Sequence, residues 1–395
     1  MDPIKNPFSP GAGTPPPELA GRDADIRRAE IAIARIKNGR HAKSEILVGL
    51  RGVGKTVLLN RFRQIAEKTG TVSVRLEAPE TRSLPALLVP GLHKAMLELD
   101  RRQAATKLLQ QAQNFLADFI RSMKVKHADV EVSLDIGNAT GESTGDLEAD
   151  ISELLKRTGE AAKERETSLL IFIDELHYVK KDEFASLIAA LHLCSQFELS
   201  VALFGAGLPQ IKGLSGKAKS YAERLFDFSE IGALTESAAE QALKVPIENE
   251  GATIAPDALS KIVSLTEGYP FFLQVWGGHA WDSADSAPIT LSDVLHANKL
   301  AITDLDSSFF RVRFDRLTPG EKHYLRAMSE LGPGPHRSGD VATVLSKAVN
   351  AVAPVRSNLI HKGMIYSPSH GDTAFTVPLF DGFMKRIMPQ LNQDD

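Results

Sequence analysis

The sequence predicts an α/β fold: a parallel β-sheet with helices on both faces, followed by an α-helical lid and a winged-helix domain. Over the first part of the chain, short apolar runs alternate with segments of helical periodicity, a pattern typical of parallel sheets. Residues 235–305 then carry helical periodicity alone. From residue 318 onward, helical segments precede a strand–turn–strand pattern, which is the order of a winged helix.

Four apolar runs are the expected strands of the sheet. The run 168–173 is uninterrupted, which suits a central strand covered on both faces. The other three lie at 45–48, 71–76 and 198–204. Helical spacing predicts the helices between them, at 26–37, 57–66, 86–123, 147–163 and 182–197.

Changes of pattern along the chain predict four segments. Residues 1–17 contain six prolines and are expected to form a disordered or loosely draped arm. The sheet domain is expected at 18–232, with an insertion at 105–145 that includes an exposed strand at 129–136. The lid is expected at 233–306 and the winged-helix domain at 307–395.

The expected elements of the last two segments follow from periodicity. Lid helices are predicted at 235–250, 256–266, 270–282 and 290–305. Trp276 and Trp281 lie on the third of these helices and are expected to pack in its core. The winged-helix domain is predicted to have helices at 318–331, 338–346 and 351–362 and a hairpin at 364–377.

Composition narrows the class of protein. The chain has 395 residues, of which 43% are hydrophobic, an ordinary value for a soluble protein. No apolar run approaches 18 residues and the N-terminus lacks the layout of a secretory signal, so we expect no membrane partner. The single cysteine, Cys194, fits a reducing compartment and is expected to be a small core residue. These features together predict a cytoplasmic protein.

Charge is distributed unevenly along the chain. The net charge of the whole chain is −4. Residues 307–395 hold 11 Lys and Arg against 8 Asp and Glu, a net charge of +3. A mildly positive module on an acidic body gives weak support for nucleic acid as a partner.

Residues 49–56 read GLRGVGKT and match the pattern G-x-x-x-x-G-K-[ST] completely. An expected strand precedes the motif and an expected helix follows it, which is the context of a phosphate-binding P-loop. Gly49, Gly52 and Gly54 are expected to let the backbone take a positive φ and approach phosphate closely. The loop amides and the helix N-terminus would form an anion site. The predicted nucleotide-binding residues are Gly49, Leu50, Arg51, Gly52, Val53, Gly54, Lys55, Thr56 and Val57.

Each polar side chain of this predicted site has an expected role. Lys55 is expected to reach the β- and γ-phosphates of ATP, and the Thr56 hydroxyl to ligate Mg²⁺. Asp174 ends the apolar run beside the P-loop and is expected to hold Mg²⁺ as well. Glu175 is the candidate base that orients or deprotonates the attacking water. The alternative is that this acidic pair simply ends a strand. His177 either faces the same water or is a solvated loop histidine.

In this order, the motifs resemble AAA+-related ATPases of the origin-recognition type and the neighbouring STAND signalling ATPases. Four features carry the resemblance over about residues 18–380: the segment 19–23 (LAGRD), the P-loop, the acidic strand end, and Gly268-Tyr-Pro270 ahead of a C-terminal winged helix. The resemblance implies that Gly21 and Arg22 contact the nucleotide base and that Pro270 lies over the adenine. An exposed arginine beside a helix N-cap at Asp23 is the alternative for Arg22.

The chain departs from the family pattern at two positions where many relatives carry a residue that contacts the γ-phosphate. The segment 204–209 (FGAGLP) has no polar residue after the expected fourth strand, and Phe271 and Phe272 follow Pro270 where many relatives have an arginine. Both departures favour a slow switch over a fast motor. Arg224 is similar in placement to the family's finger arginine, which stabilises charge on the γ-phosphate in cis or in trans. The alternative is a surface arginine paired with Glu223 or Asp227.

The helix at 351–362 is the candidate DNA-recognition helix. It carries Arg356, Asn358, His361 and Lys362, while Arg337 and His370 are placed to contact phosphate. The alternative is a winged helix that packs on the ATPase or binds a protein.

The hypothesis is therefore a slowly hydrolysing ATPase that uses ATP and Mg²⁺. Its nucleotide state would control a winged helix that binds double-stranded DNA, with self-assembly or a protein as further partners. The rival hypothesis is a STAND-like signalling scaffold whose winged helix binds a protein and makes no contact with DNA.

Overall fold

The computed structural model describes residues 1–391 except 12, 80, 103–105 and 127–140. Contacts divide the chain into two compact units. The sheet unit comprises Arg22–Gly49 and Lys55–Ile231, and the C-terminal unit comprises Met1–Gly21, Leu50–Gly54 and Gly232–Asp395. Every α-helix that the structure describes is too short or too polar to cross a lipid bilayer.

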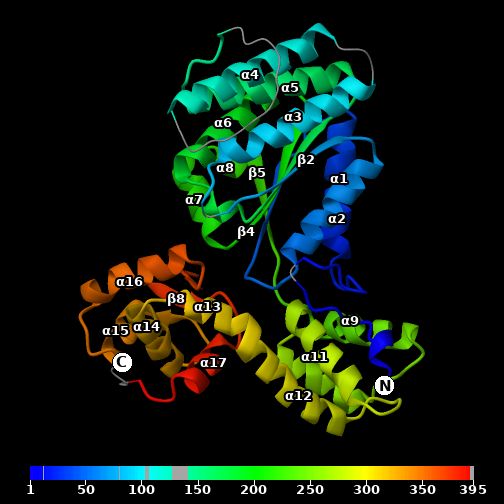
Figure 1. Ribbon diagram of the computed structural model, residues 1–395, viewed down its shortest axis with the longest axis vertical. Helices are drawn as coiled ribbons and strands as arrows, with labels where there is room; N and C mark the ends of the chain where they lie inside the picture. The colour runs from blue at the N-terminus through cyan, green and yellow to red at the C-terminus, as the bar shows by residue number, and fades with distance from the viewer. Residues whose placement is uncertain (12, 80, 103–105, 127–140, 392–395) are drawn as a thin grey trace. The chain divides into compact units, whose positions relative to one another are not determined.

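The sheet unit contains a five-stranded parallel sheet (Figure 1). Its strands are β1 (Ser44–Val48), β2 (Val72–Glu77), β3 (Leu169–Asp174), β4 (Val201–Gly207) and β5 (Phe226–Glu230). They lie in the order β2-β3-β4-β1-β5, so β4 lies between the strand that leads into the P-loop and the strand that ends in Asp174.

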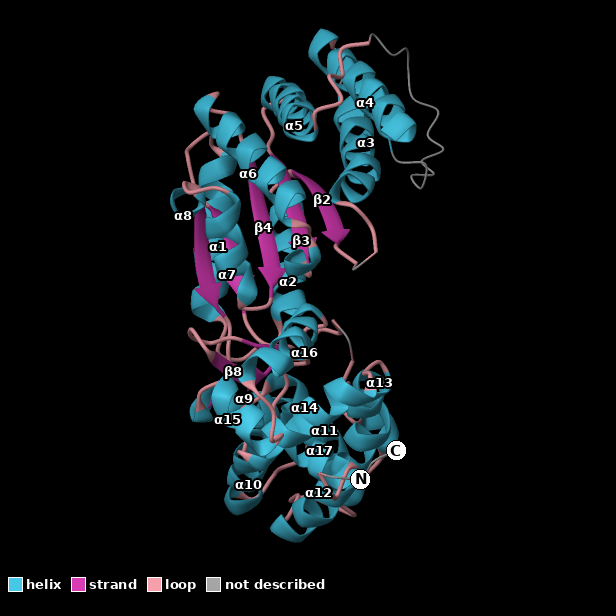
Figure 2. Ribbon diagram, turned by 90° about the vertical axis from the view of Figure 1, so that its left-hand side faces the viewer, coloured by secondary structure: helices cyan, strands magenta, loops and turns pink. Residues whose placement is uncertain are grey.

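Helices cover both faces of this sheet (Figure 2). One face packs on α2 (Lys55–Lys68), where the Phe62 ring lies 6.0 Å from that of Phe204, and α1 (Asp23–Lys37) packs on α2. Side chains alternate along a strand, so Ile171 and Leu203 face the opposite layer and join its core. That layer contains α3 (Leu84–Arg102), α4 (Lys107–Lys126), α5 (Leu147–Glu164) and α6 (Lys181–Gln196). Cys194 of α6 is fully buried, and burial raises the pKa of its thiol to about 12, as suits a core residue.

The predicted insertion contains helix α4, whereas its predicted strand at 129–136 lies outside the described residues. Two buried carboxylates hold the end of the insertion. Asp118 of α4 accepts hydrogen bonds from the backbone N–H groups of Gly141 and Glu142 at 3.0 and 3.1 Å. Asp150 of α5 accepts from Thr144 and Gly145, both at 2.9 Å. Backbone donors satisfy both buried charges, so their burial is compatible with a stable fold.

Four helices form the lid within the C-terminal unit: α9 (Glu236–Asn249), α10 (Pro256–Thr266), α11 (Pro270–Ser283) and α12 (Leu291–Leu305). Their extents lie within one or two residues of the predicted ones. Trp276 and Trp281 of α11 are buried, and the Trp276 Nε1–H donates to Asn298 Oδ1 of α12 at 3.0 Å. Both tryptophans are therefore core residues, as predicted.

The prediction of a disordered arm at 1–17 is wrong for its first part, which packs on α11. A short 3-10 helix, η1 (Pro3–Lys5), begins the chain, and the Trp281 indole N–H donates to Asp2 O at 2.9 Å. Phe8 is buried against α11, where a Cβ on Gly277 would lie 2.8 Å from its ring. Proline content indicated disorder, but an aromatic ring packed on a glycine and hydrogen bonds to α11 hold this segment.

A winged helix completes the C-terminal unit. The π-helix η3 (Asp306–Phe310) and α13 (Arg311–Asp315) lead into α14 (Pro319–Glu330), α15 (Ser338–Val344), α16 (Val349–His361) and α17 (Phe380–Ile387). The strands β6 (His336–Arg337), β8 (Asp372–Phe375) and β7 (Ile365–Tyr366) form an antiparallel sheet in that order. With the parallel sheet and the helical lid, this wing confirms the predicted fold class.

Candidate functional site

The P-loop begins where β1 ends and finishes where α2 begins. Gly52 and Gly54 have φ values of +84° and +92°, a region that glycine enters at little cost. Gly49 does not share this conformation, contrary to prediction, because its N–H extends the sheet pairing and donates to Gly207 O at 3.2 Å. The loop therefore takes its irregular conformation after Gly49.

The side chains that follow lie in the first turn of α2. Lys55 is buried, and its Nζ donates to Gly49 O at 2.9 Å, so the ammonium folds back over the start of the loop. Thr56 and Val57 come next in the helix. The first-turn N–H groups of a helix lack intrahelical acceptors and carry the positive end of its dipole, which suits an anion.

Asp174 lies at the same edge of the sheet as the P-loop. Val48 is in register with Gly207, and Ile173 with Gly205, so β1, β4 and β3 end at nearly the same level. Adjacent strands are about 4.8 Å apart, which places Asp174 about 10 Å across the sheet from the end of β1. The carboxyl edge of an open parallel sheet is where such folds bind ligands.

Glu175 turns away from the strand in a left-handed conformation, with φ +51°. Its backbone N–H donates to Asp174 Oδ1 at 2.8 Å. His177, in the 3-10 helix η2 (Leu176–Tyr178), places Nδ1 3.4 Å from Glu175 Oε2. The His177 side chain is 1% exposed, so the alternative of a solvated loop histidine is wrong.

The tip of the P-loop contacts lid and wing residues within the C-terminal unit. The Phe271 N–H donates to Gly52 O at 3.2 Å, and the Arg51 N–H donates to Thr376 O at 3.3 Å. A Cβ on Gly52 would lie 3.3 Å from the Tyr269 ring, a contact tighter than most side chains tolerate. Sequence reasoning selected Pro270 as a site residue but not Tyr269, Phe271 or Thr376. The contacts of Phe271 and Thr376 are made by the backbone, which leaves no mark on residue type.

Gly21 ends the first segment of the C-terminal unit, and Arg22 begins the sheet unit. Gly21 has φ +68°, and a Cβ there would lie 2.8 Å from the Cβ of Ala238 in α9. Arg22 is buried, so it is not the exposed arginine of the alternative, and it is the N-cap of α1 in place of Asp23. Burial lowers the pKa of the Arg22 guanidinium, and the charge of Asp25 opposes that shift.

Arg224 lies in α8 (Ala222–Leu225), just before β5. Phe226, the first residue of β5, pairs with Ser44 at the start of β1, whereas the P-loop follows the end of β1. Four residues of strand separate the two levels by about 13 Å. Arg224 is exposed at the edge of the sheet opposite its own P-loop, and Asp227 pairs with Lys43 at 3.2 Å.

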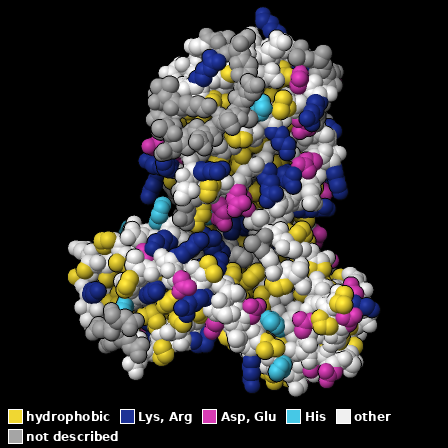
Figure 3. All heavy atoms as spheres, in the orientation of Figure 1, with side chains coloured by type: hydrophobic (Ala, Val, Ile, Leu, Met, Phe, Trp, Pro, Cys, Tyr) yellow, Lys and Arg dark blue, Asp and Glu magenta, His cyan; other side chains and the backbone are white. Residues whose placement is uncertain are grey.

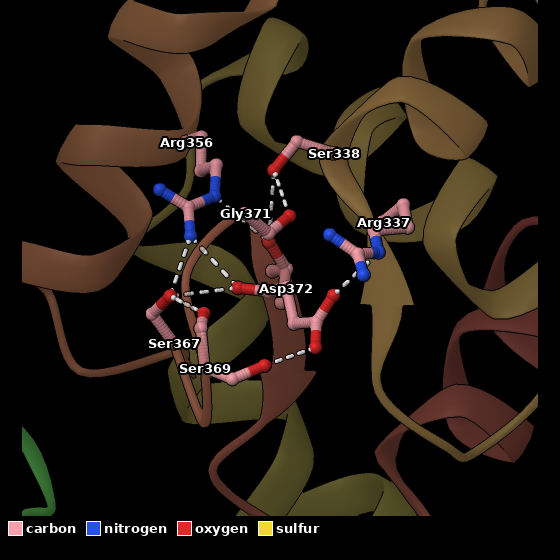
Figure 4. Close-up of polar contacts among 8 residues, drawn as sticks. Arg337, Ser338, Arg356, Ser367, Ser369, Gly371 and Asp372 are labelled. Atoms are coloured by element: carbon pink, nitrogen blue, oxygen red, sulfur yellow. Dashed lines mark hydrogen bonds and ion pairs between the residues drawn. The ribbon is translucent and has the colours of Figure 1, made fainter.

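Arg356, in the predicted recognition helix α16, binds the wing of its own domain (Figure 4). Its Nε donates to Thr373 Oγ1 at 2.8 Å, and an NH2 group donates to Asp372 O at 2.8 Å and Ser367 Oγ at 3.0 Å. Arg337 approaches the same wing, with its Nε 3.2 Å from Asp372 Oδ1. These contacts fix the geometry of the wing.

Lys362, at the end of the same helix, is also engaged. Its Nζ donates to Glu321 Oε2 at 2.7 Å and to Arg316 O at 3.1 Å. The side chains of Asn358, His361 and His370 are exposed. On the face drawn in Figure 3, Lys and Arg side chains are interspersed with Asp and Glu, so charge there does not single out one surface.

Two family models match this chain. Residues 18–204 match the model described as "AAA ATPase domain", and residues 307–384 match "Domain of unknown function (DUF8462)". The first match confirms the resemblance to AAA+-related ATPases for the segment that holds the P-loop and the acidic strand end. Residues 18–204 are therefore similar to AAA ATPase domains, and this similarity favours nucleotide binding. A comparison with curated proteins finds no match.

Solved structures are similar to this chain at low sequence identity. A Walker-type ATPase of Pyrococcus abyssi is 14% identical with a TM-score of 0.58, over 96% of this chain and 99% of that chain. The Orc1 protein of Aeropyrum pernix, solved with DNA, is 15% identical with a TM-score of 0.47, over 93% of both chains. The RuvB Holliday junction branch migration motor of Thermotoga maritima is 14% identical with a TM-score of 0.46, over 90% of this chain and 92% of that chain. The first similarity extends the shared architecture to nearly the whole chain.

Proposed function

We propose that this chain is an ATP-binding switch that uses Mg²⁺ and hydrolyses ATP slowly. The observation that carries the proposal is the meeting of two motifs at one edge of the sheet: Lys55 and Thr56 at the start of α2, and Asp174 and Glu175 at the end of β3. Both motifs lie in the segment that matches an AAA ATPase domain.

The residues at this edge suit a triphosphate with its metal. The positive φ of Gly52 and Gly54 opens the loop to close approach, and the Lys55 ammonium is the buried cation of the loop. Thr56 and Asp174 supply the hydroxyl and carboxylate oxygens that Mg²⁺ prefers. When bound, Mg²⁺ would neutralise charge on the phosphates. Glu175 would then accept a proton from the attacking water.

Slow turnover follows from the chemistry at the end of β4. The residues there are Gly205, Ala206, Gly207 and Leu208, and none offers a polar side chain to the γ-phosphate. A site that lacks one charge-stabilising group in the transition state loses rate without losing ground-state binding. That balance suits a switch, which must remain loaded for a long time.

Arg224 would complete the site in trans. It is exposed and lies at the edge of the sheet opposite its own P-loop. In an assembly it would reach the site of a neighbouring copy, where a guanidinium stabilises the charge of phosphoryl transfer. Hydrolysis would then depend on assembly.

The winged helix would bind duplex DNA through α16. Exposed Asn358 and His361 on that helix and His370 at the wing tip support this proposal, as does the net charge of +3 of residues 307–395. The engagement of Arg356 and Lys362 in contacts of their own domain keeps the rival proposal open, a signalling scaffold whose winged helix binds a protein.

ATP binding by Lys55→Ala tests the proposal for the site. Loss of the phosphate-facing cation should weaken ATP binding about 100-fold, because charge-assisted contacts to phosphate are the strongest in such a site. Isothermal titration calorimetry with and without Mg²⁺ measures the change. Lys68→Ala, at the exposed end of the same helix, is the matched control and should bind as wild type does. Equal affinity of Lys55→Ala and Lys68→Ala would refute the assignment.

A further inference from the structure

Helix α11 begins without a capping side chain. Its N-cap residue is Tyr269, whose side chain makes no capping hydrogen bond within the described part of the chain, and Pro270 at the first helical position has no N–H. The first N–H groups of a helix lack intrahelical acceptors and carry the positive end of the helix dipole. The next donor, the Phe271 N–H, therefore requires an acceptor from outside the helix.

The P-loop provides this acceptor within the C-terminal unit. The Phe271 N–H donates to Gly52 O at 3.2 Å, so a carbonyl of the loop caps the start of α11. Packing supports the hydrogen bond, because a Cβ on Gly52 would lie 3.2 Å from the Phe271 Cβ and 3.3 Å from the Tyr269 ring. The Phe271 ring is stacked on that of Phe309, with centroids 4.7 Å apart, and this contact fixes the start of the helix.

The hydrogen bond determines the orientation of one peptide group of the loop. A trans peptide is planar, and its C=O and N–H groups point in opposite directions. Holding Gly52 O on α11 therefore turns the N–H of Val53 away from this helix. Gly52 and Gly54 have φ values of +84° and +92°, and glycine offers the backbone more conformations than other residues do. A restraint from outside the loop can select one of these conformations.

We propose that Phe271 is a positioning residue for nucleotide binding. Its backbone N–H holds the Gly52–Val53 peptide group in the orientation of a phosphate cradle, in which N–H groups of the loop point to the nucleotide. A loop that is ordered in advance binds more tightly, because less conformational freedom is lost on binding. This inference rests on the proposed function, since it takes the loop to bind ATP.

This role differs from that of the arginine that many relatives carry at the start of the lid helix. An arginine side chain contacts the γ-phosphate itself, whereas the Phe271 N–H acts on the loop that surrounds the phosphates. In this chain, α11 would therefore influence the affinity for ATP through its backbone.

Substitutions at Phe271 separate the N–H from the ring. Phe271→Ala removes the ring and keeps the N–H, whereas Phe271→Pro removes both, and proline is tolerated in the first turn of a helix. We expect Phe271→Ala to bind ATP within about threefold of wild type and Phe271→Pro about tenfold more weakly, because the loop must then become ordered on binding. Asp257→Pro is the matched control, since Asp257 is exposed and holds the same position after Pro256 in α10. It should bind ATP as wild type does.

A third variant changes the donor alone. Replacement of Phe271 by L-phenyllactic acid keeps the ring and exchanges the N–H for an ester oxygen, so ATP should again bind about tenfold more weakly. Calorimetric titration with ATP and Mg²⁺ measures the affinity of the full chain. The melting temperature without nucleotide reports any loss of fold, and the two proline variants should lower it to a similar extent.

The outcomes distinguish failure of the inference from failure of the proposed function. Equal ATP affinity of Phe271→Ala, Phe271→Pro and the phenyllactate variant would overturn the inference and leave the proposed function intact. An equal loss of affinity in Asp257→Pro would also overturn it, because the effect would then follow from any proline in a lid helix. Absence of ATP binding by the wild-type chain would refute the proposed function, and the inference with it.

Discussion

The carboxyl edge of the parallel sheet and the outer side of α16 differ in how their predicted residues are used. At the sheet edge, the P-loop that leads to Lys55 follows β1 and Asp174 ends β3, and β4 alone lies between these two strands, as the motifs require. On α16, Arg356 and Lys362 are held by residues of their own domain, whereas Asn358 and His361 are exposed. The path of the backbone determines the site at the sheet edge, and such a site can be predicted from sequence. The predicted DNA contacts of α16 depend on which side chains are free to bind a ligand, and this is harder to predict.

The physical reason lies in the range of the interactions involved. The P-loop is local, because a strand, a glycine-containing loop and a helix N-terminus follow one another within a few residues. Whether Arg356 can bind a ligand depends on its contact with Thr373, and whether Lys362 can depends on its contact with Glu321. Both contacts join residues that are distant in sequence. Basic residues on a helix look alike in sequence whether they pair within the domain or face a ligand.

The largest expected effect is at the sheet edge. Glu175→Gln removes the candidate base but keeps the size and hydrogen-bonding capacity of the side chain. Turnover should fall about 1000-fold, or about 4 kcal/mol in activation free energy, with ATP affinity preserved. Single-turnover phosphate release and calorimetric titration measure the two quantities. Glu223→Gln, exposed at the opposite edge of the sheet, is the matched control and should turn over as wild type does. A similar loss in both variants would contradict the special role of the strand end.

An intermediate effect is expected where α16 holds the wing. Arg356→Ala removes three hydrogen bonds to Thr373, Asp372 and Ser367 and should lower the free energy of unfolding by about 2 kcal/mol. Chemical denaturation followed by circular dichroism measures the loss.

Arg337→Ala is the comparison for this prediction, since Arg337 is 70% exposed and pairs with Asp372 alone among the contacts described above. It should change stability by less than about 0.5 kcal/mol. If the two variants proved equally stable, Arg356 would be available to a ligand and the contrast between the two regions would weaken.

The sequence predicted the fold class, the lid helices and the order of the site motifs because these depend on periodicity and on glycine, which residue types report directly. Predictions from the sequence failed where a single contact between distant residues determines the local structure. The order of the N-terminal arm depends on Phe8 meeting the bare backbone at Gly277, and a proline-rich composition concealed that contact. Burial of His177 and Arg22 likewise depends on elements that meet only in the folded chain.

The smallest expected effect tests whether the exposed side of α16 reads DNA. Asn358→Ala removes a neutral side chain that can contact base edges, so duplex affinity should fall about fivefold, or about 1 kcal/mol. The slope of log affinity against log salt should stay unchanged, because a neutral residue displaces no counterions. Fluorescence anisotropy at several salt concentrations measures both. Asn249→Ala, an exposed asparagine at the end of α9, should bind DNA as wild type does. Absence of duplex binding by the wild-type chain at low salt would instead favour the protein-binding scaffold, since phosphate contacts are strongest under that condition.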